Sequence, residues 1–340
     1  MHGLVEELCS RRCAGRAAGS AGGRVARALI VAELRRAGLD PFEQPVPGCR
    51  GANVLATIPG DVDRWVIVGA HHDHLGVQGG RIYRGADDNA AAVAILVELA
   101  GRLARERPAG RGVLVAAFDG EEPPHFASDA MGSQRYALQP AVPLERTDLF
   151  VCMDLVGHAL GEPGMPDAVR QTVFLLGAER SSGTGAEVDA LAMAEPGLFV
   201  RRADAEIIPP LSDHGAFWER RIPFAFLTCA RSRIYHTPDD TPEHLDFAKM
   251  ASTARWLERF VRASCARDTE AVFRDARDDA STVRAMLALC DALAPSSPAA
   301  AAGGQLCRSL LAACDRDGRL PAPRTAELAM LVSGLEQGLA

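Results

Sequence analysis

The sequence lacks the features of a nucleic-acid-binding or membrane protein. No run of lysines and arginines stands clear of neighbouring acids, and the 340 residues carry a formal net charge of -7 with an isoelectric point near 5.8. A nucleic-acid surface requires clustered cations to contact phosphates. No segment of the sequence approaches the roughly 20 apolar residues of a membrane span. We therefore expect neither a nucleic-acid nor a membrane partner.

The sequence also lacks a recognisable secretory signal and a metal- or redox-type cysteine motif. Residues 1–8 contain acids where a signal would carry basic residues and an apolar core. The nine cysteines are odd in number and show no Cys-x-x-Cys spacing, and Cys152 and Cys229 lie in or beside strand-like runs. They are interpreted as buried free thiols. These features predict a soluble, cytoplasmic protein, and leave open an incomplete N-terminus or export without a recognisable signal.

Apolar runs and helical patterns alternate along the first three quarters of the chain. Residues 23–37 show helical spacing of apolar side chains and end at Gly38. Residues 90–103 are apolar on nearly every side, which is typical of a helix packed against a sheet. Strand-like runs occupy residues 53–58, 65–70, 113–118, 149–153, 172–176 and 222–228. With 48% hydrophobic residues the chain can bury a full core, and the pattern predicts an α/β fold.

The character of the sequence changes after about residue 263. Alanine-rich helical segments follow at residues 283–292, 306–313 and 326–339. Nothing in these segments has the pattern of a catalytic motif, so composition favours a role in packing or oligomer contact. We therefore divide the chain into a catalytic domain over residues 1–263 and a helical C-terminal extension over residues 264–340, the surface expected to join copies in a homo-oligomer.

Metal-binding side chains follow the ends of several strand-like runs. They are His71, Glu121, Glu122, Asp154 and, after a loop, His236. Open α/β sheets bind ligands outside the carboxyl ends of their strands, so these groups could converge. A lone histidine after a strand is more often structural, and Asp87 and Asp88 could simply cap the helix that follows them. Neither explanation accounts for acids at several strand ends at once.

The residue types indicate the chemistry of such a site. Oxygen and nitrogen ligands without a thiolate fit zinc first, with manganese or cobalt as alternatives. Asp73 lies two residues after His71, at the reach of a carboxylate that fixes the tautomer of a ligand histidine, so His72 and His74 would point elsewhere. Of two adjacent glutamates, one can bind a cation while its neighbour takes a proton from water whose pKa zinc lowers to about 7.

The order of the motifs resembles the co-catalytic zinc aminopeptidases, metallopeptidase family twenty-eight, whose relatives include bacterial leucyl aminopeptidase, glutamate carboxypeptidase and glutaminyl cyclase. The resemblance covers about residues 15–260, and its markers are residues 69–76, 85–89, 121–122, 132–133, 212–214 and 235–241. It implies a mixed, mostly parallel central sheet flanked by helices, and hydrolysis of the N-terminal bond of a peptide substrate.

The resemblance also implies a role for each ligand residue. Asp88 would bridge two zinc ions. His71 and Asp154 would complete one site, and Glu122 and His236 would complete the other. Two zinc ions per chain are therefore expected.

The resemblance further assigns the catalytic residues. Glu121 would be the general base that takes a proton from the zinc-activated water and passes it to the leaving amine, with Asp73 supporting the centre. The bridging aspartate of the family directly precedes an Asn-like position, often through a cis peptide, which favours Asp88 over Asp87. Residues 212–214 either lie near the site or cap the helix that follows them.

Two alternatives stay open. The long link between Glu122 and Gly132 is more like that of the animal-type glutaminyl cyclases, which use one zinc. Such an enzyme would cyclise N-terminal glutamine with Asp88, Glu122 and His236 as ligands. Tyr235 favours the peptidases, because cyclases tend to carry tryptophan there. The second alternative is a non-catalytic binding member of the fold, against which the complete ligand set argues.

The motifs do not determine which substrate side chain is preferred, because loops form the pocket. Loops at residues 77–83, 162–169 and 196–211 are expected to shape the pocket, with Phe126 and Phe217 as apolar walls.

Overall fold

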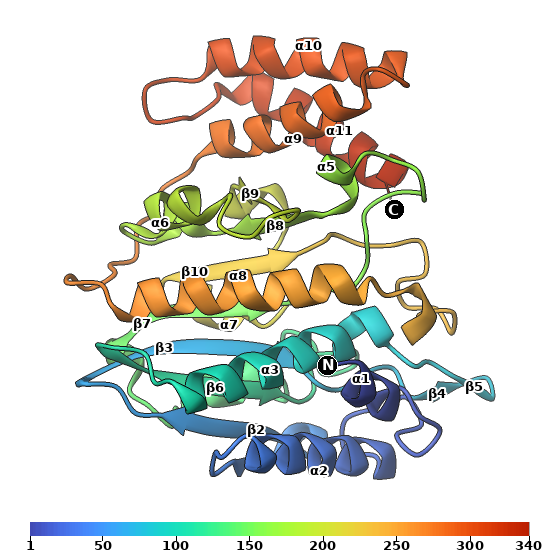
Figure 1. Ribbon diagram of the computed structural model, residues 1–340, viewed down its shortest axis with the longest axis vertical. Coiled ribbons are helices and arrows are strands. Elements are labelled where there is room, and N and C mark those ends of the chain that lie inside the picture. The colour runs from blue at the N-terminus through green and yellow to red at the C-terminus, as the bar shows by residue number, and fades with distance from the viewer. Residues whose placement is uncertain (340) are drawn as a thin grey trace.

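The centre of the molecule is an eight-stranded mixed sheet (Figure 1), in a computed structural model that describes residues 1–339. In spatial order the strands are β1 (Phe42–Val46), β2 (Gly51–Ile58), β6 (Arg111–Phe118), β3 (Val62–His71), β7 (Thr147–Met153), β10 (Phe224–Thr228), β8 (Thr172–Leu176) and β9 (Phe199–Ala203). A separate hairpin joins β4 (Val77–Gln78) to β5 (Arg81–Ile82). The expected mixed, mostly parallel sheet is confirmed, because four of the seven neighbouring pairs are parallel.

Helices cover both faces of this sheet. One face packs against α1 (His2–Leu8), α2 (Ala21–Arg36), α3 (Ala91–Arg105), α6 (Thr184–Leu191) and α8 (Phe247–Cys265). The other face packs against α4 (Gly132–Leu138), α7 (His214–Trp218), α9 (Asp279–Leu293), α10 (Pro298–Ala313) and α11 (Ala322–Leu339). Short helical segments lie at Pro47–Cys49, Ala86–Ala90, Leu144–Arg146, Asp167–Arg170 (α5), Ala178–Arg180, Ala205–Ile207 and Pro242–His244.

Successive side chains of a strand belong in turn to the two apolar layers, one on each face of the sheet. In β3, Val66 and Val68 belong to the layer under α3 and α8, whereas Ile67 between them belongs to the opposite layer. This is the period of two that a strand imposes. All three side chains are fully buried, which explains why the run reads as continuously apolar in the sequence.

The predicted elements are confirmed, and two edge strands were missed. All six strand-like runs are strands, and the helices expected at residues 23–37 and 90–103 are α2 and α3. Ser20 caps α2 by accepting a hydrogen bond from the Gly23 amide at 2.9 Å. The missed strands, β1 and β9, lie at the two edges of the sheet and are partly exposed, so neither shows a continuous apolar run.

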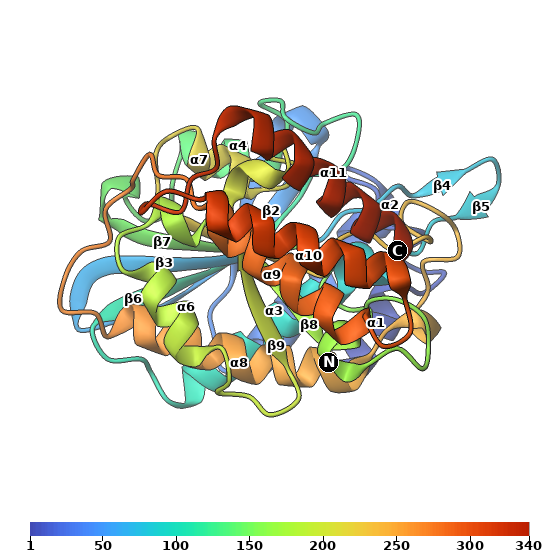
Figure 2. The same cartoon turned by 90° about the horizontal axis from the view of Figure 1, so that it is seen from above.

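The C-terminal extension forms the three expected helices, which lie beside one another at the β8–β9 end of the sheet (Figure 2). Val283, Met286 and Leu289 of α9 join the apolar layer that covers β8 and β10. The Thr282 hydroxyl accepts a hydrogen bond from the Asp204 amide at 2.8 Å, just after β9. The extension therefore shares a core with the sheet, and the division of the chain at residue 263 stays a prediction.

Two further expectations concern the cysteines and the membrane. All nine cysteines are free thiols and eight of them are buried, as expected. Within residues 1–339, none of the helices combines the length and the apolarity needed to cross a membrane.

A buried glutamate next to β8 makes the stability of the fold depend on pH. Burial, together with repulsion from Asp204, raises the pKa of Glu179 to about 8, although the Arg180 guanidinium lies 3.5 Å away. The other nitrogens of Arg180 engage Glu206 and Asp275. In the unfolded chain a glutamate has a pKa of about 4.3. Between these two values the unfolded chain ionises while the folded chain keeps its proton, so stability falls as the pH rises.

Replacing Glu179 with glutamine should remove this dependence, because the amide oxygen can still accept the hydrogen bond from the Ala205 amide. Relative to the parent, the variant should gain roughly 2–4 kcal/mol of unfolding free energy between pH 4.5 and pH 8. Urea unfolding at the two pH values measures this difference. The matched control is Glu145→Gln at an exposed position. Parallel pH profiles for the parent and Glu179→Gln would contradict the assignment.

Candidate metal centre

The candidate site lies at one edge of the sheet, where parallel strands end. The central strands β6, β3, β7 and β10 all run in the same direction. His71 is the last residue of β3, and Asp154 directly follows β7. Glu121 and Glu122 follow β6 after a turn at Gly120, whose φ of +71° suits glycine. The shared strand direction is the reason that residues distant in sequence meet here.

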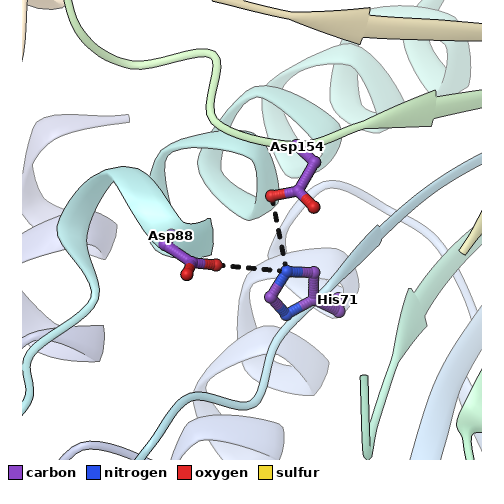
Figure 3. Close-up of side chains that lie close together, drawn as sticks. All are labelled: His71, Asp88 and Asp154. Carbon is purple, nitrogen blue, oxygen red and sulfur yellow. Dashed lines mark ion pairs between the residues drawn. The ribbon is translucent and has the colours of Figure 1, made fainter. Parts of the chain in front are cut away.

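The first ligand group consists of His71, Asp88 and Asp154 (Figure 3). The Nε2 atom of His71 lies 3.3 Å from Oδ1 of Asp88 and 3.5 Å from Oδ1 of Asp154. All three side chains are buried. The structure therefore brings together three residues that the sequence placed in one metal site.

The second ligand group uses the other oxygen of Asp88. Nε2 of His236 lies 3.0 Å from Oδ2 of Asp88 and 3.1 Å from Oε2 of Glu122. The expectation that His74 points away is wrong, because its Nδ1 lies 2.8 Å from Oε1 of Glu122 and 3.7 Å from Oδ2 of Asp88. His74, Asp88 and Glu122 themselves form a candidate metal-binding group. His72, by contrast, does point away, toward the Ala52 carbonyl oxygen at 3.2 Å.

The spacing of these atoms fits metal coordination. In a tetrahedral site with metal–ligand bonds of about 2.1 Å, neighbouring ligand atoms lie about 3.4 Å apart. The separations from the imidazoles of His71 and His236 to their carboxylate neighbours run from 3.0 to 3.5 Å. Within residues 1–339, Nε2 of His71, Oδ2 of Asp88 and Oδ1 of Asp154 are buried without a hydrogen-bond partner. A bound cation accounts for such orphaned atoms.

The side chains perturb one another strongly because they are buried together. Burial alone would lower the pKa of His71, but Glu121 and Asp154 outweigh it and raise that pKa well above its usual value. Similarly, burial alone would lower the pKa of His236, but the carboxylates of Asp88 and Glu122 outweigh it and raise that pKa to about 10. Burial raises the pKa of Glu121 well above its usual value, and repulsion from Asp154 adds to that effect. Glu121 therefore holds a proton more readily than an exposed glutamate does.

Asp73 contacts both His71 and the turn that carries the two glutamates. Its two carboxylate oxygens accept hydrogen bonds from the amides of Glu121 and Glu122 at 3.0 and 3.1 Å. Nδ1 of His71 lies 3.3 Å from the Asp73 carbonyl oxygen and 3.7 Å from its carboxylate. Both the carbonyl oxygen and the carboxylate of Asp73 therefore lie near Nδ1 of His71, where either can orient the imidazole.

Asp240 and Asp87 hold the backbone that carries Asp88. The carboxylate of Asp240 accepts hydrogen bonds from the amides of Asp87 and Asp88 at 2.8 and 3.1 Å. Asp87 itself turns away from the ligand groups and contacts Nδ1 of His158 at 2.7 Å. The peptide bond between Asp88 and Asn89 is cis. Sequence reasoning included Asp240 in a motif but gave it no role, since its partners are backbone amides.

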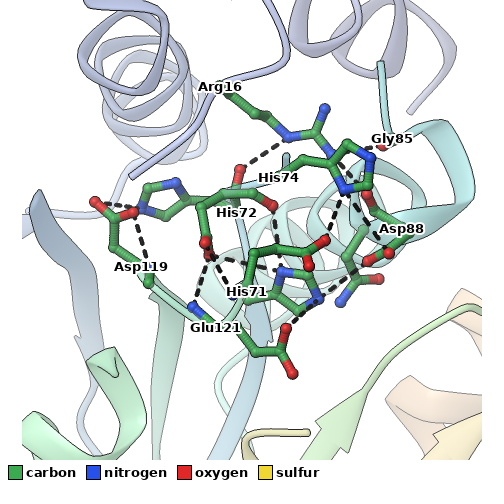
Figure 4. Close-up of polar contacts among 12 residues, drawn as sticks. Arg16, His71, His72, His74, Gly85, Asp88, Asp119 and Glu121 are labelled. Atoms are coloured by element: carbon green, nitrogen blue, oxygen red, sulfur yellow. Dashed lines mark hydrogen bonds and ion pairs between the residues drawn. The ribbon is translucent and has the colours of Figure 1, made fainter. Parts of the chain in front are cut away.

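Arg16 is a supporting residue that sequence reasoning missed. Its buried guanidinium donates to the carbonyl oxygens of His72 at 2.8 Å, Gly85 at 2.5 Å and Asp88 at 3.0 Å, and also to that of Arg84 (Figure 4). One cation therefore ties the loop after β3 to the loop that carries Asp88. The only sequence signal was its position next to the start of the family resemblance.

Replacing Arg16 with methionine should weaken metal binding. The change leaves buried carbonyl oxygens without donors and frees the loop of Asp88, and loss of such outer support typically lowers metal affinity by about 10- to 100-fold. Competition with a fluorescent zinc chelator measures the affinity. Arg12→Met, at an exposed position of the same segment, is the control. Unchanged affinity in a folded Arg16→Met protein would restrict Arg16 to a role in stability.

Asp213, like Ser212 of the same motif, lies close to the ligand residues. It occupies the N-cap position of α7 but makes no capping hydrogen bond. Its carboxylate is fully buried, and burial raises its pKa to about 7, with His71 and Asp154 acting on it as well. His214 instead stacks on Phe226, with ring centroids 4.3 Å apart. The interpretation that the motif lies near the site is therefore favoured over a simple helix cap.

A cavity of about 330 Å³ opens beside the ligand groups. Phe126 lines it, as expected, together with residues from the predicted 196–211 loop such as Ile207 and Leu211. Phe217 does not line the cavity but stacks on Phe150 in the core, with centroids 3.9 Å apart. Most of the remaining lining is apolar, which suits an organic substrate.

A mixed α/β sheet with candidate metal-binding groups at the ends of its parallel strands is an arrangement typical of metal-dependent hydrolases. Comparison with protein families agrees, because the sequence pattern of peptidase family M28 matches residues 53–261. The chain belongs to peptidase family M28.

The curated relatives include an uncharacterized protein and glutaminyl-peptide cyclotransferases. The chain is 30% identical over 228 residues to the uncharacterized protein YfbL of Escherichia coli K12, a match that covers 61% of this chain and 69% of YfbL. It is 27% identical over 260 residues to the glutaminyl-peptide cyclotransferase of Boiga irregularis, covering 65% of this chain and 68% of that protein.

Solved structures show the same fold. The LapA aminopeptidase of Legionella pneumophila superposes with a TM-score of 0.63 at 16% identity, over 79% of this chain and 73% of LapA. A Zn-dependent exopeptidase of Parabacteroides distasonis superposes with a TM-score of 0.61 at 19% identity, over 78% of this chain and 97% of that one. At these identities the likeness concerns the fold alone.

Proposed function

We propose that this protein is a zinc-dependent aminopeptidase that hydrolyses the N-terminal bond of peptides with two zinc ions per chain. The observation that carries the proposal is the use of Asp88: its Oδ1 lies in one ligand group with His71, and its Oδ2 lies in the other with His236. A carboxylate whose two oxygens lie in two ligand groups is able to serve both ions of a two-metal centre. Membership of peptidase family M28 supports the same class of reaction.

The chain would hold the two ions through its two ligand groups. His71, Asp88 and Asp154 would bind one ion, and Asp88, Glu122 and His236 would bind the other, with His74 orienting Glu122 through its short contact. Zinc in such a site lowers the pKa of water to about 7 and polarises the substrate carbonyl.

Glu121 would move the proton. Its carboxylate lines the cavity, and its Oε2 lies 3.7 Å from Nε2 of His71. It would accept a proton from the attacking water and donate it to the leaving amine, for which its raised pKa is suited. Asp73 positions Glu121 by accepting the hydrogen bond from its amide. Asp213, buried beside Glu121, opposes a second negative charge there and so favours the protonated state that the second step needs.

The second candidate function is glutaminyl-peptide cyclisation with one zinc. The similarity to the Boiga cyclotransferase favours it, and Asp88, Glu122 and His236 form a compact ligand group by themselves, with separations of 3.0 and 3.1 Å. In that reaction Glu121 would carry a proton between the substrate amine and the departing ammonia. Asp154 would then bind no second ion, and its negative charge would help to raise the pKa of Glu121.

Metal analysis combined with two assays separates the candidates. The purified chain is analysed for zinc, then tested on a panel of aminoacyl-nitroanilides and on a glutaminyl peptide, with and without a chelator. About two zinc ions per chain with chelator-sensitive release of nitroaniline supports the aminopeptidase. About one zinc ion, no release and cyclisation of the glutaminyl peptide moves the assignment to the transferase. Bound zinc without either reaction would favour a non-catalytic binding protein.

A further inference from the structure

The cavity beside the ligand groups has two chemically different ends. Its charged end is lined by Asp88, Glu121, Glu122 and Asp154. The rest of its lining is mainly apolar and extends across β8, β9 and β10 to the C-terminal helices. A substrate that reacts at the charged end therefore projects an apolar group toward the far end, because most of the lining there offers a polar group no partner to replace its hydration.

One side of α9 contributes to the apolar end. Thr282, Met286 and Leu289 line the cavity, and their spacing places them on one face of the helix. The hydrogen bond from the Asp204 amide to the Thr282 hydroxyl fixes this face against the end of β9. The position of the α9 wall is therefore set by the sheet itself.

One side of α11 closes the same end. Val332, Leu335 and Leu339 line the cavity at helical spacing, together with Glu336. Their helix begins at Ala322, far beyond residue 261, where the match to the peptidase family ends. This wall is thus built by the extension and not by the matched region.

The end of α11 is joined to two of the loops that carry ligand residues. The amide of Gly161, in the loop after Asp154, donates to the Leu339 carbonyl oxygen at 2.9 Å. Arg231, in the loop before His236, forms an ion pair with Glu336 at 3.1 Å. These contacts hold the apolar wall at a set distance from the reacting groups.

We propose that α9 and α11 are the specificity-determining wall of the active site, and that they select peptides whose amino-terminal residue has a bulky apolar side chain, up to the size of tryptophan. The inference rests on the proposed aminopeptidase function. A cavity of about 150 Å³ is enough to hold benzene, so a volume of about 330 Å³ has room for a two-ring side chain. A small side chain would leave the apolar wall in contact with water.

The test replaces a cavity-lining residue of α11 with a larger one, so that less space is left for the substrate side chain. Leu335→Trp places a larger side chain on the wall, and Met330→Trp places the same side chain on the exposed side of α11, where Met330 is 70% exposed. We expect Leu335→Trp to lower the ratio of kcat/KM for tryptophanyl over alanyl nitroanilide by at least about 10-fold. Met330→Trp should leave the ratio unchanged. If Leu335→Trp does not fold, Met286→Phe on α9 makes the same test.

A binding measurement separates this inference from the proposed function. Tryptophan amide is titrated calorimetrically into the Glu121→Gln protein with and without Leu335→Trp, and at least about 10-fold weaker binding is expected with the larger wall residue. A parent protein without aminopeptidase activity that still shows this loss would overturn the proposed function and keep the apolar subsite. An active parent in which both the ratio and the binding are unaffected by the wall variants would overturn the inference and leave the function standing.

Discussion

Replacing Glu121 with glutamine lowers kcat by about 100- to 10,000-fold if Glu121 is the general base. The amide has nearly the same shape but cannot accept a proton at neutral pH. The backbone amide of residue 121 keeps its hydrogen bond to Asp73, so the turn should stay in place. Glu121 belongs to neither ligand group, and the zinc content should therefore stay at the value of the parent protein. Steady-state kinetics and metal analysis on one preparation measure both quantities.

The control for this change is an exposed glutamate. Glu106, whose side chain is 86% exposed, is replaced by glutamine and should change neither kcat nor the metal content. Unchanged turnover in Glu121→Gln would eliminate the proposed mechanism. Loss of zinc from Glu121→Gln would instead show that Glu121 is a metal ligand and that another group is the general base.

Replacing Asp88 with asparagine should remove at least one metal ion per chain and lower kcat/KM by about 1,000-fold. The two oxygens of Asp88 serve two ligand groups, and an amide offers only one oxygen and no negative charge. Metal analysis gives the stoichiometry, and thermal unfolding gives a second measure. Added zinc should raise the Tm of the parent protein and should raise that of Asp88→Asn much less.

The neighbouring aspartate is a matched control, since Asp87 and Asp88 were both candidates in the sequence. The carboxylate of Asp87 contacts His158 and the Gly157 amide, so Asp87→Asn should lower the unfolding free energy by about 1–3 kcal/mol and keep the metal content. If Asp87→Asn does not fold, Asp239→Asn at an exposed position replaces it. Full metal content in Asp88→Asn, or its loss in Asp87→Asn, would contradict the assignment of the shared ligand.

The elements of the fold could be predicted where burial is nearly complete. Strand β3 is buried in its second half and β6 throughout, and their continuous apolar runs mark them in the sequence. Strand β1 has mostly exposed or partly exposed residues, so its identity as a strand comes from pairing with β2. An edge strand of this kind depends on a partner that local sequence does not reveal.

The candidate site could be predicted to the level of residue identity. The residues named as ligands lie together because strand ends on one side of a parallel sheet must meet, and the order of the motifs selected them among other acids. His74 was misjudged because the direction of a side chain after a strand depends on the turn that follows. The imidazole of His74 packs directly against the backbone of Gly85. A Cβ atom at residue 85 would lie only 2.4 Å from the ring, so glycine at that position leaves room for the His74 side chain.

The sequence by itself determined the α/β class and the candidate metal-binding residues, and its resemblance to a known family implied Asp88 rather than Asp87 as the expected bridge. These depend on local periodicity and on motifs of a few residues. Only the tertiary structure decided that Arg16 binds backbone 56 to 72 residues away, and that α9 and α11 line the cavity of the site. The physical reason is that both arrangements consist of contacts between segments far apart in the chain, and such contacts exist only once the sheet has brought those segments together.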